Sequence, residues 1–201
     1  FSYFHRGCTH ARCPTPGVGS AQPEHVRVLG CIGPGLVDRV VGRASRVELH
    51  LCTSGEGCGR VSMFPRNRAP GPILRTRRGR CGEYSYVWLL MLRSLGYEAR
   101  WVSDWTDHCW VEVRLPGHPG WVHTDPCERA LGRPRMYAEG WGKRHNYVVA
   151  FGEGRLEDVT PVYALDRSTY MAERDLSEMD VERVLDEVNH RMQGGRSTGD
   201  H

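Results

Sequence analysis

The sequence has 201 residues, of which 39% are hydrophobic, and this length is typical of one domain or of one domain with a small module. The longest apolar run, from Tyr86 to Leu92, is far shorter than the ~18 residues that a membrane-spanning helix needs. These observations exclude an integral membrane protein and a mainly disordered chain, and we expect no membrane partner.

The charged side chains are nearly balanced, with 27 basic against 24 acidic residues and a formal net charge of +3. Lys143 is the only lysine, so almost all of the positive charge is arginine. Arginine binds phosphate well, which keeps nucleic acid among the candidate partners. The arginines are spread along the whole chain among acidic residues, however, as in a compositional bias, and we expect no nucleic-acid partner.

The chain begins at Phe1 without a methionine, and we interpret it as a piece of a longer protein from which a leader could be missing. Its eight cysteines include two close pairs, at 8/13 and 52/58, and otherwise occur singly. This grouping is typical of metal ligands and working thiols in a reducing compartment. An extracellular protein with four disulfides is the alternative.

Residues 1–72 are expected to be largely irregular, because glycine and proline recur there in clusters that mark turns. Short strands are predicted at 26–29 and 47–51, the second from its alternation of apolar and polar residues. A segment with so little periodicity needs another source of order, and its paired cysteines are the candidates.

Two pairs of thiolates can complete a tetrahedral zinc site that joins this segment to the rest of the chain. The predicted ligands of a structural Zn²⁺ are Cys8, Cys13, Cys52 and Cys58. Two alternatives stay open: His10 or His50 could replace one sulfur, or the four thiols could be reduced and hold no metal.

Residues 73–165 are richer in regular patterns. A helix is predicted from the apolar run that follows Cys81, and Gly96 is placed where a helix ends. Antiparallel strands and hairpins are predicted at 98–102, 109–115, 121–123, 147–151 and 156–159. One helix followed by antiparallel strands indicates an α+β domain.

A C-terminal extension, residues 166–193, contains one more predicted helix. Ser177 and Asp180 resemble a capping box, and apolar residues recur after them at helical spacing up to Met192. The apolar face of this helix could pack in the core or dock a partner. Residues 194–201 are predicted to be disordered.

A cysteine, a histidine and an aspartate that follow one another along the chain suggest catalysis by a thiol. Cys81 immediately precedes the predicted helix, where backbone amides and nearby arginines favour the thiolate. Attack by a thiolate needs a proton donor for the leaving group, and His108 stands at the start of a strand. Asp125 ends the next strand, so adjacent antiparallel strands could place it beside His108 and orient the imidazole. Each residue taken alone could equally be an inert structural side chain.

The chain carries four motifs in order: TRRGRCGE at 76–83, WTDH at 105–108, WVHTDPCE at 121–128 and GWGK at 140–143. Together they resemble the cytoplasmic peptide:N-glycanase family of the transglutaminase-like superfamily. The resemblance is continuous over about residues 45–165. It implies an α+β transglutaminase-like, papain-like cysteine-hydrolase core, in which the helix that bears the nucleophile packs on an antiparallel sheet.

The resemblance implies that Cys81, His108 and Asp125 form a catalytic triad. The implied reaction is hydrolysis of the side-chain amide that links an N-glycan to asparagine, through a thioester, giving aspartate and a glycosylamine. The implied partners are misfolded N-glycoproteins, with ubiquitin-shuttle proteins and the proteasome in ER-associated degradation. The implied location is the cytoplasm, and also the nucleus.

Trp110, Trp121 and Glu128 are candidates for substrate binding, since sugars stack on aromatic rings and hydrogen-bond to carboxylates. The two tryptophans could instead be core residues, and Glu128 could pair with an arginine. The resembling enzymes also carry zinc, but between cysteine pairs of tighter spacing, so the longer spacings here are a departure.

Two other readings compete with the enzyme. The first is a catalytically silent transglutaminase-like scaffold that binds glycoproteins or proteasome-pathway partners; the presence of all three triad residues argues against it. The second is DNA recognition, because a DNA-damage sensor uses a related fold and the chain is rich in arginine.

Overall fold

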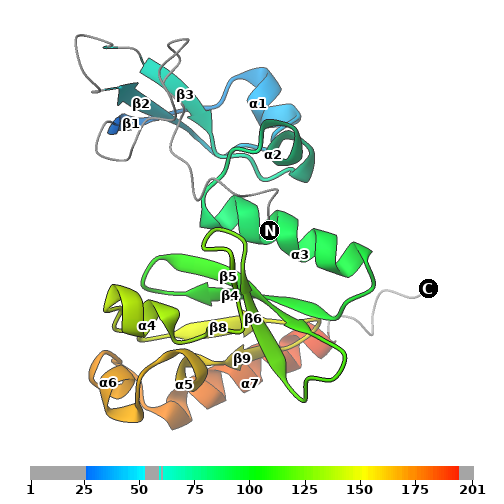
Figure 1. The fold of residues 1–201 in the computed structure, drawn as a ribbon, viewed down its shortest axis with the longest axis vertical. Coiled ribbons are helices and arrows are strands. Elements are labelled where there is room, and N and C mark those ends of the chain that lie inside the picture. Colours follow the sequence, from blue (N-terminus) through cyan, green and yellow to red (C-terminus); the bar gives the residue numbers. More distant parts are fainter. Residues whose placement is uncertain (1–25, 53–58, 60, 195–201) are drawn as a thin grey trace. The chain divides into compact units, whose positions relative to one another are not determined.

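The computed structural model describes residues 26–52, 59 and 61–194 (Figure 1). The predictions for Cys8, Cys13 and Cys58, and for the tail 195–201, lie outside the described residues. The chain forms two compact units, residues 1–87 with 126–128, and residues 88–125 with 129–201. None of the helices in the described ranges has the length and apolar character that crossing a bilayer requires.

The first unit contains an antiparallel sheet in the order β1-β2-β3, formed by Val26–Ile32, Val47–Cys52 and Val61–Pro65. The two predicted strands are therefore confirmed, and the described part of this segment is more regular than expected. Two short helices, α1 (Leu36–Val40) and α2 (Pro70–Thr76), were not predicted. The prolines of α2 suggested a turn, but its first turn accepts proline because the amides there have no helical partner.

The second unit contains six antiparallel strands in the order β7-β6-β5-β4-β8-β9. Their bounds are β4 Ala99–Asp104, β5 His108–Arg114, β6 Trp121–Asp125, β7 Ala130–Leu131, β8 Val148–Phe151 and β9 Leu156–Asp158. The predicted α+β architecture with antiparallel strands is confirmed; the two-residue strand β7 here and strand β3 of the first unit were not predicted.

Helix α3 (Cys81–Ser94) begins in the first unit and ends in the second. Its second half packs on one face of the six-stranded sheet, where Trp88, Leu89 and Leu92 meet apolar residues of β4 and β5. The Trp88 indole N–H also donates to the Thr124 hydroxyl at 2.9 Å. The predicted packing of this helix on the sheet is thus observed for the half of α3 that lies in the second unit.

The second unit contains four more helices: α4 (Met136–Trp141) lies between β7 and β8, and α5 (Thr160–Tyr163), α6 (Arg167–Ala172) and α7 (Glu178–Gly194) follow β9. Tyr137 of α4 and Tyr163 of α5 pack with Trp110 and Val102 on the sheet face opposite α3. The sheet therefore has a core on each face. Helices α4, α5 and α6 are too short to show a helical period in the sequence.

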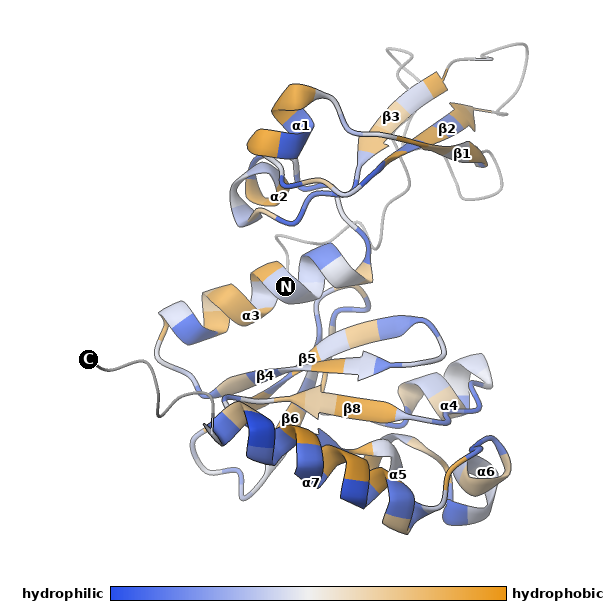
Figure 2. Cartoon of the chain, turned by 180° about the vertical axis from the view of Figure 1, so that it is seen from behind, coloured by the Kyte–Doolittle hydropathy of each residue, from blue (hydrophilic) through white to orange (hydrophobic). Residues whose placement is uncertain are grey.

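Helix α7 begins with the predicted capping interaction, because the Asp180 amide donates to the Ser177 hydroxyl at 3.1 Å. Figure 2 shows apolar residues among the polar ones along it, and Val181 is buried. The Asn189 side chain pairs with the Leu156 backbone, accepting from the amide at 2.6 Å and donating to the carbonyl at 3.0 Å. The core-packing interpretation of this helix is supported, although Val184 stays half exposed.

Candidate active site

The N-terminus of α3 places Cys81 in the first helical turn, where its side chain is partly exposed. The Glu83 carboxylate reaches back and accepts a hydrogen bond from the Arg80 amide at 3.0 Å, as in a capping box. Gly79 allows the chain to turn here, since a Cβ atom would lie 2.8 Å from the Glu83 Cβ. The partial positive charge at this helix N-terminus favours a thiolate at Cys81.

Buried ion pairs hold this helix start in place. Arg66 donates to both carboxylate oxygens of Glu83, at 2.5 and 3.1 Å. Arg66 and Arg80 also donate to the two oxygens of Glu48, at 2.8 and 2.6 Å. Strand β2, which carries Glu48, is thereby tied to the turn that carries Cys81.

The second unit brings His108 and Asp125 together. The two residues lie on adjacent antiparallel strands, β5 and β6, and His108 Nε2 lies 2.8 Å from Asp125 Oδ2. Both are buried, the carboxylate completely. The predicted strand pairing is confirmed, and because Asp125 occupies Nε2, Nδ1 is the ring nitrogen suited to exchange a proton with a substrate.

A buried hydrogen-bonded chain continues behind Asp125, and neither of its further members was predicted as a site residue. The Tyr137 hydroxyl donates to Asp125 Oδ2 at 2.7 Å, and His123 Nε2 lies 2.7 Å from the same hydroxyl. Because the hydroxyl proton goes to Asp125, His123 must donate through Nε2. In this hydrogen-bonded series, His123 donates to the Tyr137 hydroxyl and Tyr137 donates to the Asp125 carboxylate, which also meets His108.

His123 is suited to this role in its neutral form. Burial lowers the pKa of His123 to about 4, and this outweighs the attraction of the nearby Asp125 carboxylate. With the proton on Nε2, the ring nitrogen Nδ1 carries none, and it has no hydrogen-bond partner among the described residues.

The turn before His108 is built around a second buried carboxylate. Asp104 accepts from the Thr106 amide and hydroxyl at 3.0 and 2.7 Å and from the Lys143 ammonium at 2.9 Å. Burial alone would raise the pKa of Asp104, but the His145 ring, 3.1 Å from the carboxylate, and the hydrogen bonds from Thr106 and Lys143 outweigh it and hold this pKa well below its usual range. The tight turn, in which Asp107 adopts a φ of 72°, delivers the chain to the first residue of β5.

Of the predicted substrate contacts, Trp110 is wrong, whereas Trp121 lies away from His108 and its role in substrate binding stays a prediction. Trp110 is completely buried, with its ring centre 4.6 Å from those of Tyr137 and Tyr163, so it has no open face for a sugar. Trp121 lies at the other end of β6 from Asp125, about 13 Å along the strand.

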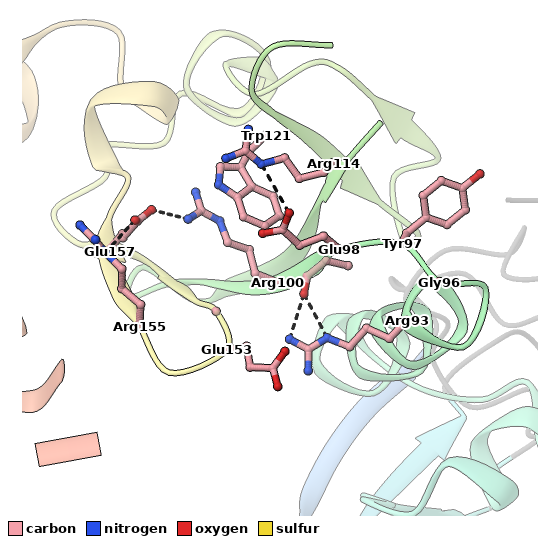
Figure 3. A pocket seen from close by; sticks show the side chains of 12 residues that line it. Arg93, Gly96, Tyr97, Glu98, Arg100, Arg114, Trp121, Glu153, Arg155 and Glu157 are labelled. Carbon is pink, nitrogen blue, oxygen red and sulfur yellow. Dashed lines mark hydrogen bonds and ion pairs between the residues drawn. The ribbon is translucent and has the colours of Figure 1, made fainter. Parts of the chain in front are cut away.

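The surroundings of Trp121 are a separate pocket of about 730 Å³ (Figure 3). The guanidinium carbons of Arg100 and Arg114 lie 4.2 and 4.7 Å from its ring centre. Arg100 is in turn bonded to the buried Glu112 at 2.6 Å. The ring thus packs against two arginines of a charged network.

An aromatic residue that was not predicted as a contact does lie beside the imidazole. Trp141, at the end of α4, packs edge-on to His108 with 5.4 Å between ring centres, and it is 45% exposed. It therefore combines contact with His108 and an accessible indole. Glu128 is exposed, and its role in substrate binding stays a prediction.

The comparison with known proteins accords with this geometry. Residues 37–126 match the model of the transglutaminase-like superfamily. This chain belongs to that superfamily.

Curated relatives within the superfamily carry the name peptide-N(4)-(N-acetyl-beta-glucosaminyl)asparagine amidase. The chain is 41% identical to the one from Gallus gallus over 157 residues, which is 78% of this chain and 24% of the relative. It is 39% identical to the one from Caenorhabditis elegans over 157 residues (78% and 25%), and 40% identical to the one from Homo sapiens over 137 residues (68% and 20%). The chain thus spans about a quarter of the length of these relatives.

Of the predicted zinc ligands, the structure describes one. Cys52 ends β2 and is buried at 5% exposure, a position suited to a structural thiolate, while the other three lie outside the described residues.

In this transglutaminase-like chain, the sequence signal that could have revealed His123 is its spacing from Asp125, since alternate residues of a strand share one face. No comparable local signal marks Tyr137 or Trp141.

Proposed function

We propose that this chain is the catalytic part of an amidase that hydrolyses the side-chain amide between an N-glycan and asparagine. The observation that carries the proposal is the buried His108–Asp125 hydrogen bond of 2.8 Å, in a chain that also starts a helix with Cys81. The 41% identity to a relative named for this reaction supports the substrate class. The chain's own residues supply the three groups that thiol-dependent amide hydrolysis needs.

In the proposed reaction the Cys81 thiolate adds to the side-chain carbonyl carbon of the glycosylated asparagine. The carbon–nitrogen bond then breaks, and His108 gives its proton to the departing glycosylamine nitrogen, which leaves a thioester on Cys81. Water, deprotonated by His108, adds to the thioester carbon, and collapse of the adduct releases aspartate and restores the thiolate. Asp125 keeps the imidazole oriented and stabilises its protonated form.

Trp141 is the proposed contact for the sugar next to the asparagine. Its ring is accessible and lies against His108, where the glycosylamine must leave. Trp110 and Trp121 are not part of this proposal, because one is buried and the other packs against arginines. Glu128 is kept as a second proposed contact.

The biological setting is proposed on the same basis. The substrates would be misfolded N-glycoproteins in ER-associated degradation, in the cytoplasm and nucleus. Ubiquitin-shuttle proteins and the proteasome are the proposed partners. The name of the relatives supports N-glycoproteins as the substrate class, and the setting and partners are those that the family resemblance implies.

A structural zinc ion bound by Cys8, Cys13, Cys52 and Cys58 is also proposed. Four thiolates would bind it tetrahedrally and supply folding free energy to the first unit, with no part in the reaction. Elemental analysis should give about one zinc per chain, and Cys52→Ser should lower this content and the thermal stability together. A folded protein that contains no zinc would overturn this site.

The amidase itself is tested with a defined glycopeptide in heavy-oxygen water. Mass spectrometry should find a peptide in which asparagine has become aspartate with one heavy oxygen in the new carboxylate, together with the intact glycan. Cys81→Ala should abolish turnover and leave the circular dichroism spectrum unchanged. Turnover by that variant would refute the nucleophile assignment, and glycopeptide binding without conversion by the wild-type protein would favour the silent scaffold.

A further inference from the structure

The first unit contains a pocket of about 650 Å³ that the proposed reaction does not use. Gly82, Glu83 and Tyr86 of α3 form one wall, so this wall begins one residue after Cys81. Four arginines line the rest, together with the side chains of Ser45 and Asn67: Arg43, Arg46, Arg66 and Arg68.

Backbone hydrogen bonds between two loops fix these arginines side by side. The Arg68 and Ala69 amides both donate to the Gly42 carbonyl at 2.9 Å, and the Arg66 amide donates to the Arg46 carbonyl at 2.9 Å. The loops approach so closely that a Cβ atom on Gly42 would lie 2.2 Å from the side-chain oxygen of Asn67. The positive charges therefore project from a preformed backbone, which reduces the entropy lost when a ligand binds.

The positive charge of the pocket is only partly neutralised. Glu83, the acidic residue of the lining, is already bonded to Arg66 at 2.5 and 3.1 Å. Arg46 approaches Glu48 no closer than 3.6 Å, and Glu48 is shared with Arg66. All three remaining arginines, at 43, 46 and 68, are exposed.

Arg43 and Arg68 make no ion pair with any residue that the structure describes. Arginine presents a planar fork of donors that matches a carboxylate or a phosphate. A concave site with two such forks, a hydroxyl and an amide is complementary to an anionic group. The aromatic ring of Tyr86 adds an apolar wall beside them.

We propose that this pocket binds an anionic side chain, a carboxylate or a phosphate, of the polypeptide substrate close to the residue that Cys81 attacks. The inference rests on the proposed amidase function and adds a sequence preference to it. Gly82 lines the pocket and follows Cys81 in the chain, so a side chain a few residues from the attacked asparagine can reach the pocket. Acidic or phosphorylated segments would then be processed faster than neutral ones.

The test uses three glycopeptides that differ only in residues two to four positions from the glycosylated asparagine: glutamates, a phosphoserine, or glutamine and serine. We expect kcat/KM to be about 3- to 10-fold higher for the anionic peptides, mainly through KM, and the preference to shrink as salt is added. The glutamate and phosphoserine arms distinguish the two sources of the anion. The double variant Arg43→Gln/Arg68→Gln should lose the preference and keep the rate on the neutral peptide.

Arg183→Gln is the matched control, because Arg183 is an exposed arginine on α7, in the other unit, and the preference should persist in it. Equal rates for all three peptides with the wild-type protein, or a preference that survives the double variant, would overturn the inference and leave the amidase intact. No hydrolysis of any peptide would instead refute the proposed function. Tighter binding of DNA or anionic vesicles than of the acidic peptide, lost in the double variant, would show that the ligand class is wrong.

Discussion

The phenolic oxygen of Tyr137 lies 2.7 Å from the Asp125 oxygen that also meets His108 Nε2. One carboxylate oxygen therefore accepts from an imidazole and from a buried hydroxyl at the same time. Helix α4 carries Tyr137, so this helix helps to position the residue that orients His108.

Tyr137→Phe should lower kcat by about tenfold with little change in KM, since a hydrogen bond to a charged group contributes ~1.5–3 kcal/mol. A carboxylate that has lost this donor attracts the imidazolium proton more strongly. The limb of the pH–rate profile that reports His108 should therefore move to higher pH. Steady-state kinetics over a pH series measures both effects.

Tyr163→Phe is the control for that variant. Tyr163 is equally buried and packs on the same Trp110, but its hydroxyl donates to Glu112 at 2.7 Å and not to Asp125. Its loss should reduce stability without moving the pH–rate profile. Identical profiles for the two variants would contradict a positioning role for Tyr137.

Trp141→Ala should weaken substrate binding. An accessible indole beside His108 is suited to a sugar ring, and an aromatic contact contributes roughly 0.5–1.5 kcal/mol, so KM for a glycopeptide should rise about 3- to 10-fold. Trp121→Ala should leave KM unchanged, because that ring packs against arginines at the other end of β6. The assignment fails if the Trp121 variant shows the larger KM effect.

His123 should make the protein less stable in mild acid. Its pKa is lowered from 6.5 to about 4 by burial, so between these values the unfolded chain binds a proton that the folded chain does not. The contribution of His123 to the free energy of unfolding should be fully present above pH 6.5. The free energy of unfolding should then fall as the pH decreases toward 4, by on the order of 3 kcal/mol.

Urea unfolding at several pH values measures this loss, and His123→Gln should flatten the slope in that window. Asp104 does not confuse the measurement, because its pKa lies below its ordinary 3.8 and its contribution is lost only in stronger acid. A variant that keeps the full slope would show that another group is responsible.

Lys143→Met should destabilise the turn before His108. The ammonium group bonds Asp104 at 2.9 Å and the Thr106 carbonyl at 2.8 Å, and its removal leaves a buried carboxylate without that cation, at a cost of ~3–5 kcal/mol. Denaturant unfolding should show the loss, and kcat should fall with it. Adding Asp104→Asn should recover part of the stability, since the amide carries no charge; no recovery would argue against the ion pair as the cause.

The sequence alone determined the order of the chemical groups and their elements. Cys81 precedes an apolar run that ends at a glycine, and His108 and Asp125 stand on segments of alternating pattern separated by a Pro-Gly turn. These are local signals, because helix ends, strands and turns depend on residues close in the chain. The motifs were similarly contiguous, which is why the superfamily could be recognised before the fold was known.

Tertiary structure decided which side chains surround these groups. Tyr137 and Trp141 reach Asp125 and His108 through α4, a helix of six residues that is too short for a periodic signal. The burial of Trp110 depends on α4 and α5 covering its face of the sheet, whereas Trp121 stays at an end of the strand among arginines. Tryptophans of both kinds look alike in sequence, because a ring's exposure is set by the elements that pack over it and not by its neighbours in the chain.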